Sequence, residues 1–166
     1  MRTKIRREVA YGVSIVQLLD QSNIIVYVGT GEKENLYLPK NKLVLWDEDM
    51  ASVAAELVLA APIKDIKLRR DCLVAICELK CYIYTVESLE RFAAIDSFDN
   101  PLGLCACSTD LSSLTLAMPS HNDGHRPWIS VYTYTGRIQV DNIANNPNHN
   151  NQNISNGGGS IDSQAE

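Results

Sequence analysis

Short runs of β-branched and aliphatic residues recur along this chain in sets of four, separated by turn residues, and no stretch keeps a helical period for long. The first set comprises Val13–Leu19, Asn23–Gly29, Lys42–Asp47 and Ala54–Leu59. The second set comprises Ile63–Leu68, Cys72–Cys77, Cys81–Val86 and Arg91–Ile95. The third set comprises Leu102–Cys107, Ser113–Met118, Trp128–Tyr134 and Arg137–Val140. Because such runs predict β-strands, the chain reads as repeated copies of one four-stranded unit.

The sets recur at about forty to fifty residues, which is the period of four-stranded β-propeller blades. Trp46-Asp47 closes the third run of the first set, and Tyr84-Thr85 and Tyr132-Thr133 hold the equivalent places. The sequence therefore predicts an all-β fold, a partial WD40-like propeller of about three blades. The predicted blades are residues 13–59, 63–95 and 102–140.

The two ends of the chain differ in composition from the blades. Residues 1–12 form an N-terminal segment, and residues 141–166 are rich in Asn, Gly, Ser and Gln. A segment this polar buries too little apolar surface to offset the entropy cost of ordering. We expect the C-terminal tail to be disordered.

Charge and cysteine usage limit the partners and the compartment. The formal net charge of -5 gives no broad basic surface for nucleic acid. No apolar run approaches the roughly 20 residues that a membrane-spanning helix needs. The five cysteines, an odd number, stand among strand residues and no secretory leader precedes them, which predicts a reducing, cytosolic compartment.

No catalytic motif is found, and we predict a binding module without a cofactor. The chain lacks a nucleophile elbow, and Gly29-Thr30-Gly31 lacks the lysine of a phosphate-binding loop. One metal site is an alternative, because Cys105 and Cys107 share a strand face and His121 with His125 follow them. The favoured interpretation is that the two thiols pack as small apolar groups and that the two histidines are solvated loop residues.

Three segments together resemble the PROPPIN family, the phosphoinositide-binding WD-repeat propellers of autophagy. The stretch from Gly12 to Leu19, followed by Pro39-Lys40-Asn41-Lys42-Leu43-Val44-Leu45-Trp46-Asp47, is similar to the family's second blade. Leu68-Arg69-Arg70-Asp71 with the strand after it is similar to the third blade. Asn100-Pro101-Leu102-Gly103-Leu104-Cys105-Ala106 is similar to the opening of the fourth.

The resemblance implies an autophagy adaptor that acts as a protein-docking scaffold in autophagosome formation. Complete family members are recruited to phosphatidylinositol 3-phosphate membranes, which implies a cytoplasmic protein peripheral to endosomal or preautophagosomal membranes. The family's lipid-binding Phe-Arg-Arg-Gly motif is absent from this chain, because Arg69-Arg70 is followed by Asp71. No lipid-binding residue is therefore assigned here. A WD-repeat scaffold with no membrane role is the alternative.

The early blades of the family present a rim to partners of the lipid-transfer or conjugation-machinery type. By position in the matching motifs, Pro39, Lys40, Arg69 and Arg70 are the candidate docking residues. The alternative for each is a solvated turn residue.

Three blades cannot close a propeller, so the outward faces of the terminal blades need a cover. We expect Ile15, Val26 and Val44 at one end, and Ile129 and Val131 at the other, to face water. The chain is accordingly expected to self-associate, to borrow blades from a second chain, or to fold marginally.

Overall fold

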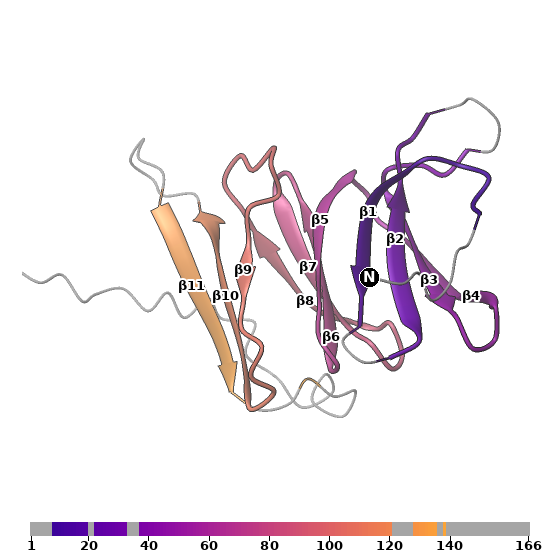
Figure 1. The fold of residues 1–166 in the computed structure, drawn as a ribbon. Coiled ribbons are helices and arrows are strands. Elements are labelled where there is room, and N and C mark those ends of the chain that lie inside the picture. Colours follow the sequence, from indigo (N-terminus) through magenta and orange to yellow (C-terminus); the bar gives the residue numbers. More distant parts are fainter. Residues whose placement is uncertain (1–7, 20–21, 33–36, 121–127, 136–137, 139–166) are drawn as a thin grey trace, which may run out of the picture.

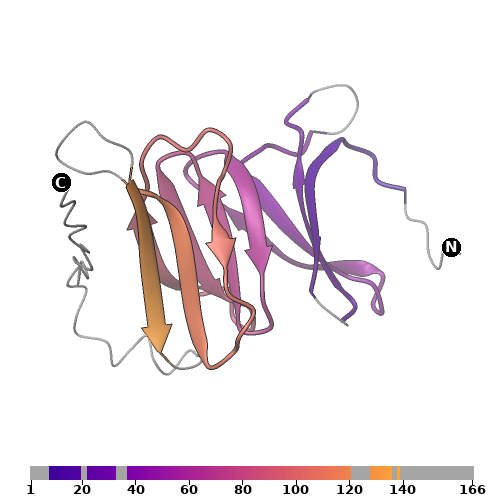
Figure 2. The same ribbon diagram turned by 60° about the vertical axis from the view of Figure 1, so that its left-hand side comes forward.

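The computed structural model describes residues 8–19, 22–32, 37–120, 128–135 and 138, which form eleven antiparallel strands in three sheets. The sheets stand side by side like the leaves of a fan (Figures 1 and 2). The first sheet holds β1 Val13–Leu18, β2 Ile24–Gly29, β3 Lys42–Asp47 and β4 Ser52–Val58. The second holds β5 Ile63–Leu68, β6 Cys72–Cys77, β7 Lys80–Thr85 and β8 Arg91–Asp96. The third holds β9 Ala106–Cys107, β10 Ser113–Ser120 and β11 Trp128–Thr135.

Within each sheet, every strand pairs with the next along the chain, in the orders β1-β2-β3-β4, β5-β6-β7-β8 and β9-β10-β11. The prediction of an all-β partial propeller is confirmed, and we call the three sheets blade one, blade two and blade three. The expected strand Arg137–Val140 lies outside the described residues apart from Ile138, which is buried. The predicted tail, 141–166, also lies outside them. Among the described residues, no helix is long and apolar enough to cross a bilayer.

Two backbone irregularities recur at equivalent places of blades one and two. Pairing of the first strand shifts register between Val13 and Ile15 in blade one and between Ile63 and Asp65 in blade two. A second shift follows at Trp46 and at Tyr84, near the end of each third strand. Bulges are positional features of a fold, so their recurrence supports a structural repeat.

The turn after each third strand is also built alike in these two blades. The side-chain oxygen of Asp47 accepts hydrogen bonds from the backbone of Asp49 and Met50, and Thr85 accepts one from Glu90. Four residues after Asp47 and Thr85, Ala51 and Leu89 adopt left-handed backbone angles, with φ of 48° and 54°. The equivalence of Trp46-Asp47 with Tyr84-Thr85 thus has a physical basis, because both pairs end a strand and cap its turn.

The core lies between the blades. One apolar cluster joins blades one and two through residues such as Val28, Leu43, Leu73 and Tyr84. A second joins blades two and three through residues such as Val74, Ile83 and Leu116. β6 serves both clusters, and all six of its residues are buried, as expected for a strand covered on both faces.

The prediction for the N-terminal open face is wrong for all three residues named, because none of them is exposed. Val26 is fully buried and Ile15 packs with it, because alternate residues of these strands turn toward blade two. Val44 does point outward, yet Leu38 and Tyr11 cover it. For the C-terminal end the prediction is confirmed, since Ile129 and Val131 are 76% and 61% exposed.

The left-handed turn residue gives a first prediction. Ala51 is exposed, and its left-handed backbone angle brings its Cβ into a steric conflict that glycine, which has no Cβ, avoids. We expect Ala51→Gly to raise the free energy of unfolding by about 0.5 kcal/mol after the entropy cost of a more flexible unfolded chain. Ala94→Gly, at an exposed place in β8, should lower it by about 0.5–1 kcal/mol. Equal destabilisation in urea titrations of both variants would contradict the assignment.

Candidate docking surfaces and the inter-blade latch

Pro39 and Lys40 form the turn that opens β3, and hydrogen bonds hold its backbone in place. The carbonyl of Pro39 accepts from the amide of Lys42 at 3.1 Å, and the carbonyl of Lys40 accepts from the amide of Ile63 at 2.8 Å. The second of these bonds ties the turn to the start of blade two. Pro39 is half-buried and Lys40 is exposed, so the turn presents a cation from a fixed backbone.

Gly31 supports the position of the Lys40 side chain. Its φ of +73° suits glycine, and a Cβ placed there would lie 3.0 Å from Cγ of Lys40. The aliphatic stem of Lys40 therefore runs over the backbone of the loop before it reaches solvent.

Arg69 and Arg70 lie in the turn between β5 and β6, at the opposite end of β5 from Lys40. Six strand residues separate the two ends, which corresponds to about 20 Å. The structure therefore does not bring the four candidate residues together on one rim. It places them on two surfaces, and of the arginine pair only Arg70 is exposed.

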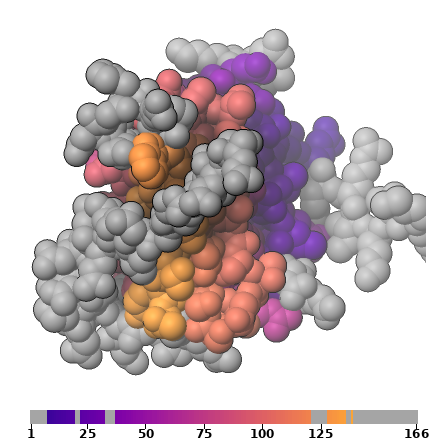
Figure 3. Space-filling view, turned by 90° about the vertical axis from the view of Figure 1, so that its left-hand side faces the viewer, coloured from indigo at the N-terminus to yellow at the C-terminus, as the bar shows by residue number. Residues whose placement is uncertain are grey.

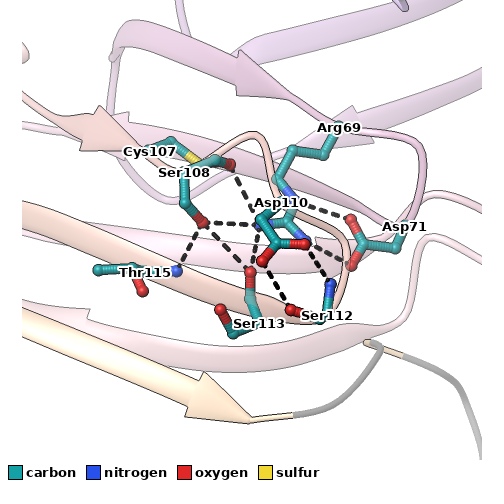
Figure 4. Close-up of polar contacts among 8 residues, drawn as sticks. All are labelled: Arg69, Asp71, Cys107, Ser108, Asp110, Ser112, Ser113 and Thr115. Carbon is teal, nitrogen blue, oxygen red and sulfur yellow. Dashed lines mark hydrogen bonds and ion pairs between the residues drawn. The ribbon is translucent and has the colours of Figure 1, made fainter.

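Arg69 is a buried residue that links blade two to blade three (Figure 4). Its Nε and Nη2 donate to the two carboxylate oxygens of Asp71, both at 2.9 Å. Its Nη1 donates to the carbonyls of Ser108 and Ser113 and to the Ser108 hydroxyl, at 2.9–3.1 Å. We call Arg69, Asp71, Ser108 and Ser113 the inter-blade latch.

The electrostatics of the latch are those of a satisfied buried ion pair. Burial alone lowers the pKa of Arg69, and the hydrogen bond and negative charge of Asp71 outweigh that effect and raise it. Ser108 extends the network, because its hydroxyl accepts from the amide of Thr115 at 2.9 Å. With its charge and donors engaged inside the chain, the Arg69 guanidinium has a fixed structural role. Sequence inspection missed this role, although an aspartate two residues after the arginine at a strand turn was a visible signal.

Cys105 and Cys107 pack in the apolar cluster between blades two and three. Burial and then the neighbouring Cys107 raise the pKa of Cys105 to about 11, and burial raises the pKa of Cys107. Metal ligation needs thiolates, which these surroundings disfavour. Within the described residues no group of three or more His, Cys, Asp or Glu side chains is placed to hold a metal ion. His121 and His125 lie outside those residues, so the zinc alternative stays a prediction.

The architecture defines the class of protein. The antiparallel sheets repeat, pack face to face and, in the two four-stranded sheets, have a capped turn after the third strand. Sheets of this kind are the blades of a WD40-like propeller. In fold the chain is similar to KlAtg21, solved in complex with the coiled coil of AgAtg16, with a TM-score of 0.61, 17% identity, and cover of 80% of this chain and 41% of that one. It is also similar to Sqt1 of Saccharomyces cerevisiae, with a TM-score of 0.53, 12% identity, and cover of 75% and 32%. No family model matches.

The sequence relatives are autophagy proteins. The chain is 30% identical to autophagy-related protein 18e of Arabidopsis thaliana over 113 residues, 68% of this chain and 30% of the relative. It is 29% identical to autophagy-related protein 18 of Komagataella pastoris over 152 residues, 87% of this chain and 27% of the relative. The chain belongs to the PROPPIN family and carries a partial propeller of it, as the sequence motifs predict. It spans about 30% of the length of these relatives.

The latch gives a second prediction. Arg69→Lys keeps the charge and loses the two-pronged contact with Asp71 and several contacts with blade three. We expect the free energy of unfolding to fall by about 2 kcal/mol, because an ammonium group cannot make all of these hydrogen bonds and leaves buried oxygens unpaired. Arg70→Lys, one residue along and exposed, should change it by less than about 0.5 kcal/mol. Equal stability of the two variants in chemical denaturation would contradict a role of the latch in blade packing.

The thiols give a third prediction. Burial raises the pKa of every cysteine, to about 11 for Cys77 and Cys105. At pH 8 such a thiol is ionised to about one part in a thousand. We expect the folded chain to resist iodoacetamide and the unfolded chain to take up five labels. Ser52→Cys, at an exposed place in blade one, supplies a reactive control. Labelling of Cys105 as fast as the control would contradict the burial.

Proposed function

We propose that this chain is the protein-docking part of a PROPPIN-like adaptor in autophagosome formation. The carrying observation is the fixed, exposed turn of Pro39 and Lys40 in a chain whose sequence relatives are autophagy proteins. The chain acts by binding, not by catalysis. Its partners are autophagy proteins of the lipid-transfer or conjugation-machinery type.

A lysine held on a rigid turn favours an acidic partner surface. Charged rim residues mainly steer association and set specificity, because opposite charges attract before contact. The coiled coil of AgAtg16, bound to KlAtg21 in a solved complex, is a suitable probe of the conjugation-machinery type. Arg70, at the far end of β5, belongs to a different surface.

For the membrane, we propose that the complete adaptor reaches phosphatidylinositol 3-phosphate through residues that the present sequence does not include. The Phe-Arg-Arg-Gly motif is absent, and Arg69, the nearest resemblance, is buried in the latch. The proposed location is cytoplasmic, peripheral to endosomal or preautophagosomal membranes.

Flotation of this chain with phosphatidylinositol 3-phosphate liposomes should leave it at the bottom of the gradient. Specific flotation would contradict the proposed division of roles.

The docking role gives a fourth prediction. Lys40→Glu should weaken binding of an Atg16-type coiled coil or of a lipid-transfer partner by about tenfold, because it replaces attraction by repulsion at the docking turn. Arg70→Glu makes the same charge change at the other end of the blade and should leave that affinity unchanged. Titration calorimetry measures both. Unchanged binding by Lys40→Glu would refute the docking turn, and a loss with Arg70→Glu alone would move the docking surface to the opposite end.

A further inference from the structure

Two large apolar side chains are exposed at the end of blade two nearest Lys40. Leu79 lies in the turn between β6 and β7, and Leu102 lies in the loop between β8 and β9; they are 62% and 76% exposed. Figures 1 and 2 show the β8–β9 loop at the end of the fan where β3 and β5 begin. In the side view of Figure 3, salmon atoms of this part of the chain reach the upper edge. Blade two packs against a sheet on each face, and its end loops lie outside those contacts.

Hydrogen bonds hold the backbone that presents these two side chains. The amide of Ser97 donates to the carbonyl of Leu79 at 2.9 Å. The amide of Asn100 donates to the carbonyl of Glu78 at 3.0 Å. The Asn100 side chain is buried, and it accepts from the amide of Leu104 at 2.7 Å and donates to the carbonyl of the same residue at 3.0 Å. The turn and the loop therefore form one rigid unit, and a rigid apolar surface binds with a small loss of conformational entropy.

The start of β5 joins this rigid unit to the docking turn. The amide of Ile63 donates to the carbonyl of Lys40 at 2.8 Å. The next residue, Lys64, lies against Gly103, where an added Cβ would come within 2.8 Å of the Cβ of Lys64. The φ of Gly103 is +67°, so the backbone angle and the close contact both require glycine. Leu102, which precedes Gly103, is thereby held beside the same strand end as Lys40.

Charges of opposite sign flank the two leucines. Lys40 is exposed on the side of blade one. Asp99 is exposed on the side of blade three, because the amide of the preceding Phe98 donates to the carbonyl of Pro119 in β10 at 3.3 Å. Two lysines near this unit are already paired with acids: Lys64 with Glu78, and Lys80 with Asp96. The surface therefore has a positive side and a negative side, with apolar side chains between them.

We propose that Leu79, Asp99 and Leu102 form an apolar dock, a site for a partner segment that has apolar residues between an acidic and a basic residue. The apolar residues of the segment contact the two leucines, its acidic residue faces Lys40, and its basic residue faces Asp99. The inference rests on the proposed docking role of Lys40 and adds the chemistry of the partner. Apolar anchors supply most of the affinity of such a site, and the two charges set the direction in which the segment lies.

Peptide selection tests the proposal on the full chain. Random peptides of about 12 residues, long enough to cross the end of a blade when extended, are displayed on phage and selected on the immobilised chain. We expect the retained peptides to carry apolar residues between an acidic and a basic residue. Retained peptides without this order, or no retention above that of unselected phage, would overturn the proposal.

A retained peptide is then the probe for variants of the chain in fluorescence anisotropy titrations. Leu79→Ser combined with Leu102→Ser should raise its Kd by about tenfold or more, because the apolar contacts are lost. Both side chains are exposed, so circular dichroism should show an unchanged fold. Met50→Ser combined with Val53→Ser is the matched control, because it changes two exposed apolar residues at the opposite end of blade one, and it should leave the Kd unchanged.

The two charges are tested with the same peptide. Asp99→Lys should raise the Kd by about fivefold, and a peptide with its basic residue changed to glutamate should bind this variant better than the parent chain. Unchanged binding by the leucine variant, with weaker binding by Lys40→Glu, would overturn the apolar dock and leave the docking turn in place. Unchanged binding by Lys40→Glu would instead overturn the docking turn and the proposal that rests on it.

Discussion

The packing of blade two against a sheet on each of its faces is the constraint on which the rest of the structure depends. β6 lies at the centre, with Leu73 and Ala75 turned to blade one and Val74 and Ile76 turned to blade three. A strand buried on both sides must be apolar throughout, which explains its unbroken run of buried residues. Burial of apolar surface is therefore the main interaction that holds the sheets together, and hydrogen bonds set their orientation.

The inter-blade latch adds direction to this packing. Apolar faces can slide over each other. The Arg69 guanidinium, in contrast, can donate all of its hydrogen bonds only in the arrangement set by Asp71 and the oxygens of Ser108 and Ser113. A satisfied buried ion pair contributes little net stability compared with apolar residues, yet its loss leaves uncompensated charge. It therefore fixes how the turn of blade two meets the turn of blade three.

The same architecture separates possible functions in space. Lys40 lies at one end of the blades and Arg70 at the other, so one partner touching both would have to span the height of a strand.

The sequence by itself determined the strands, their grouping in sets of four and the family. The alternation of residues along a strand, the turn residues and the repeat period are local properties of a sequence, and the folded core is compatible with all of them. The motif around Trp46-Asp47 likewise foretold a capped turn. Only the tertiary structure decided that Arg69 is buried, that Val44 is covered by Tyr11 and Leu38, and that the candidate docking residues lie on two surfaces. These outcomes depend on which segments meet across blades, and sequence spacing does not contain that information.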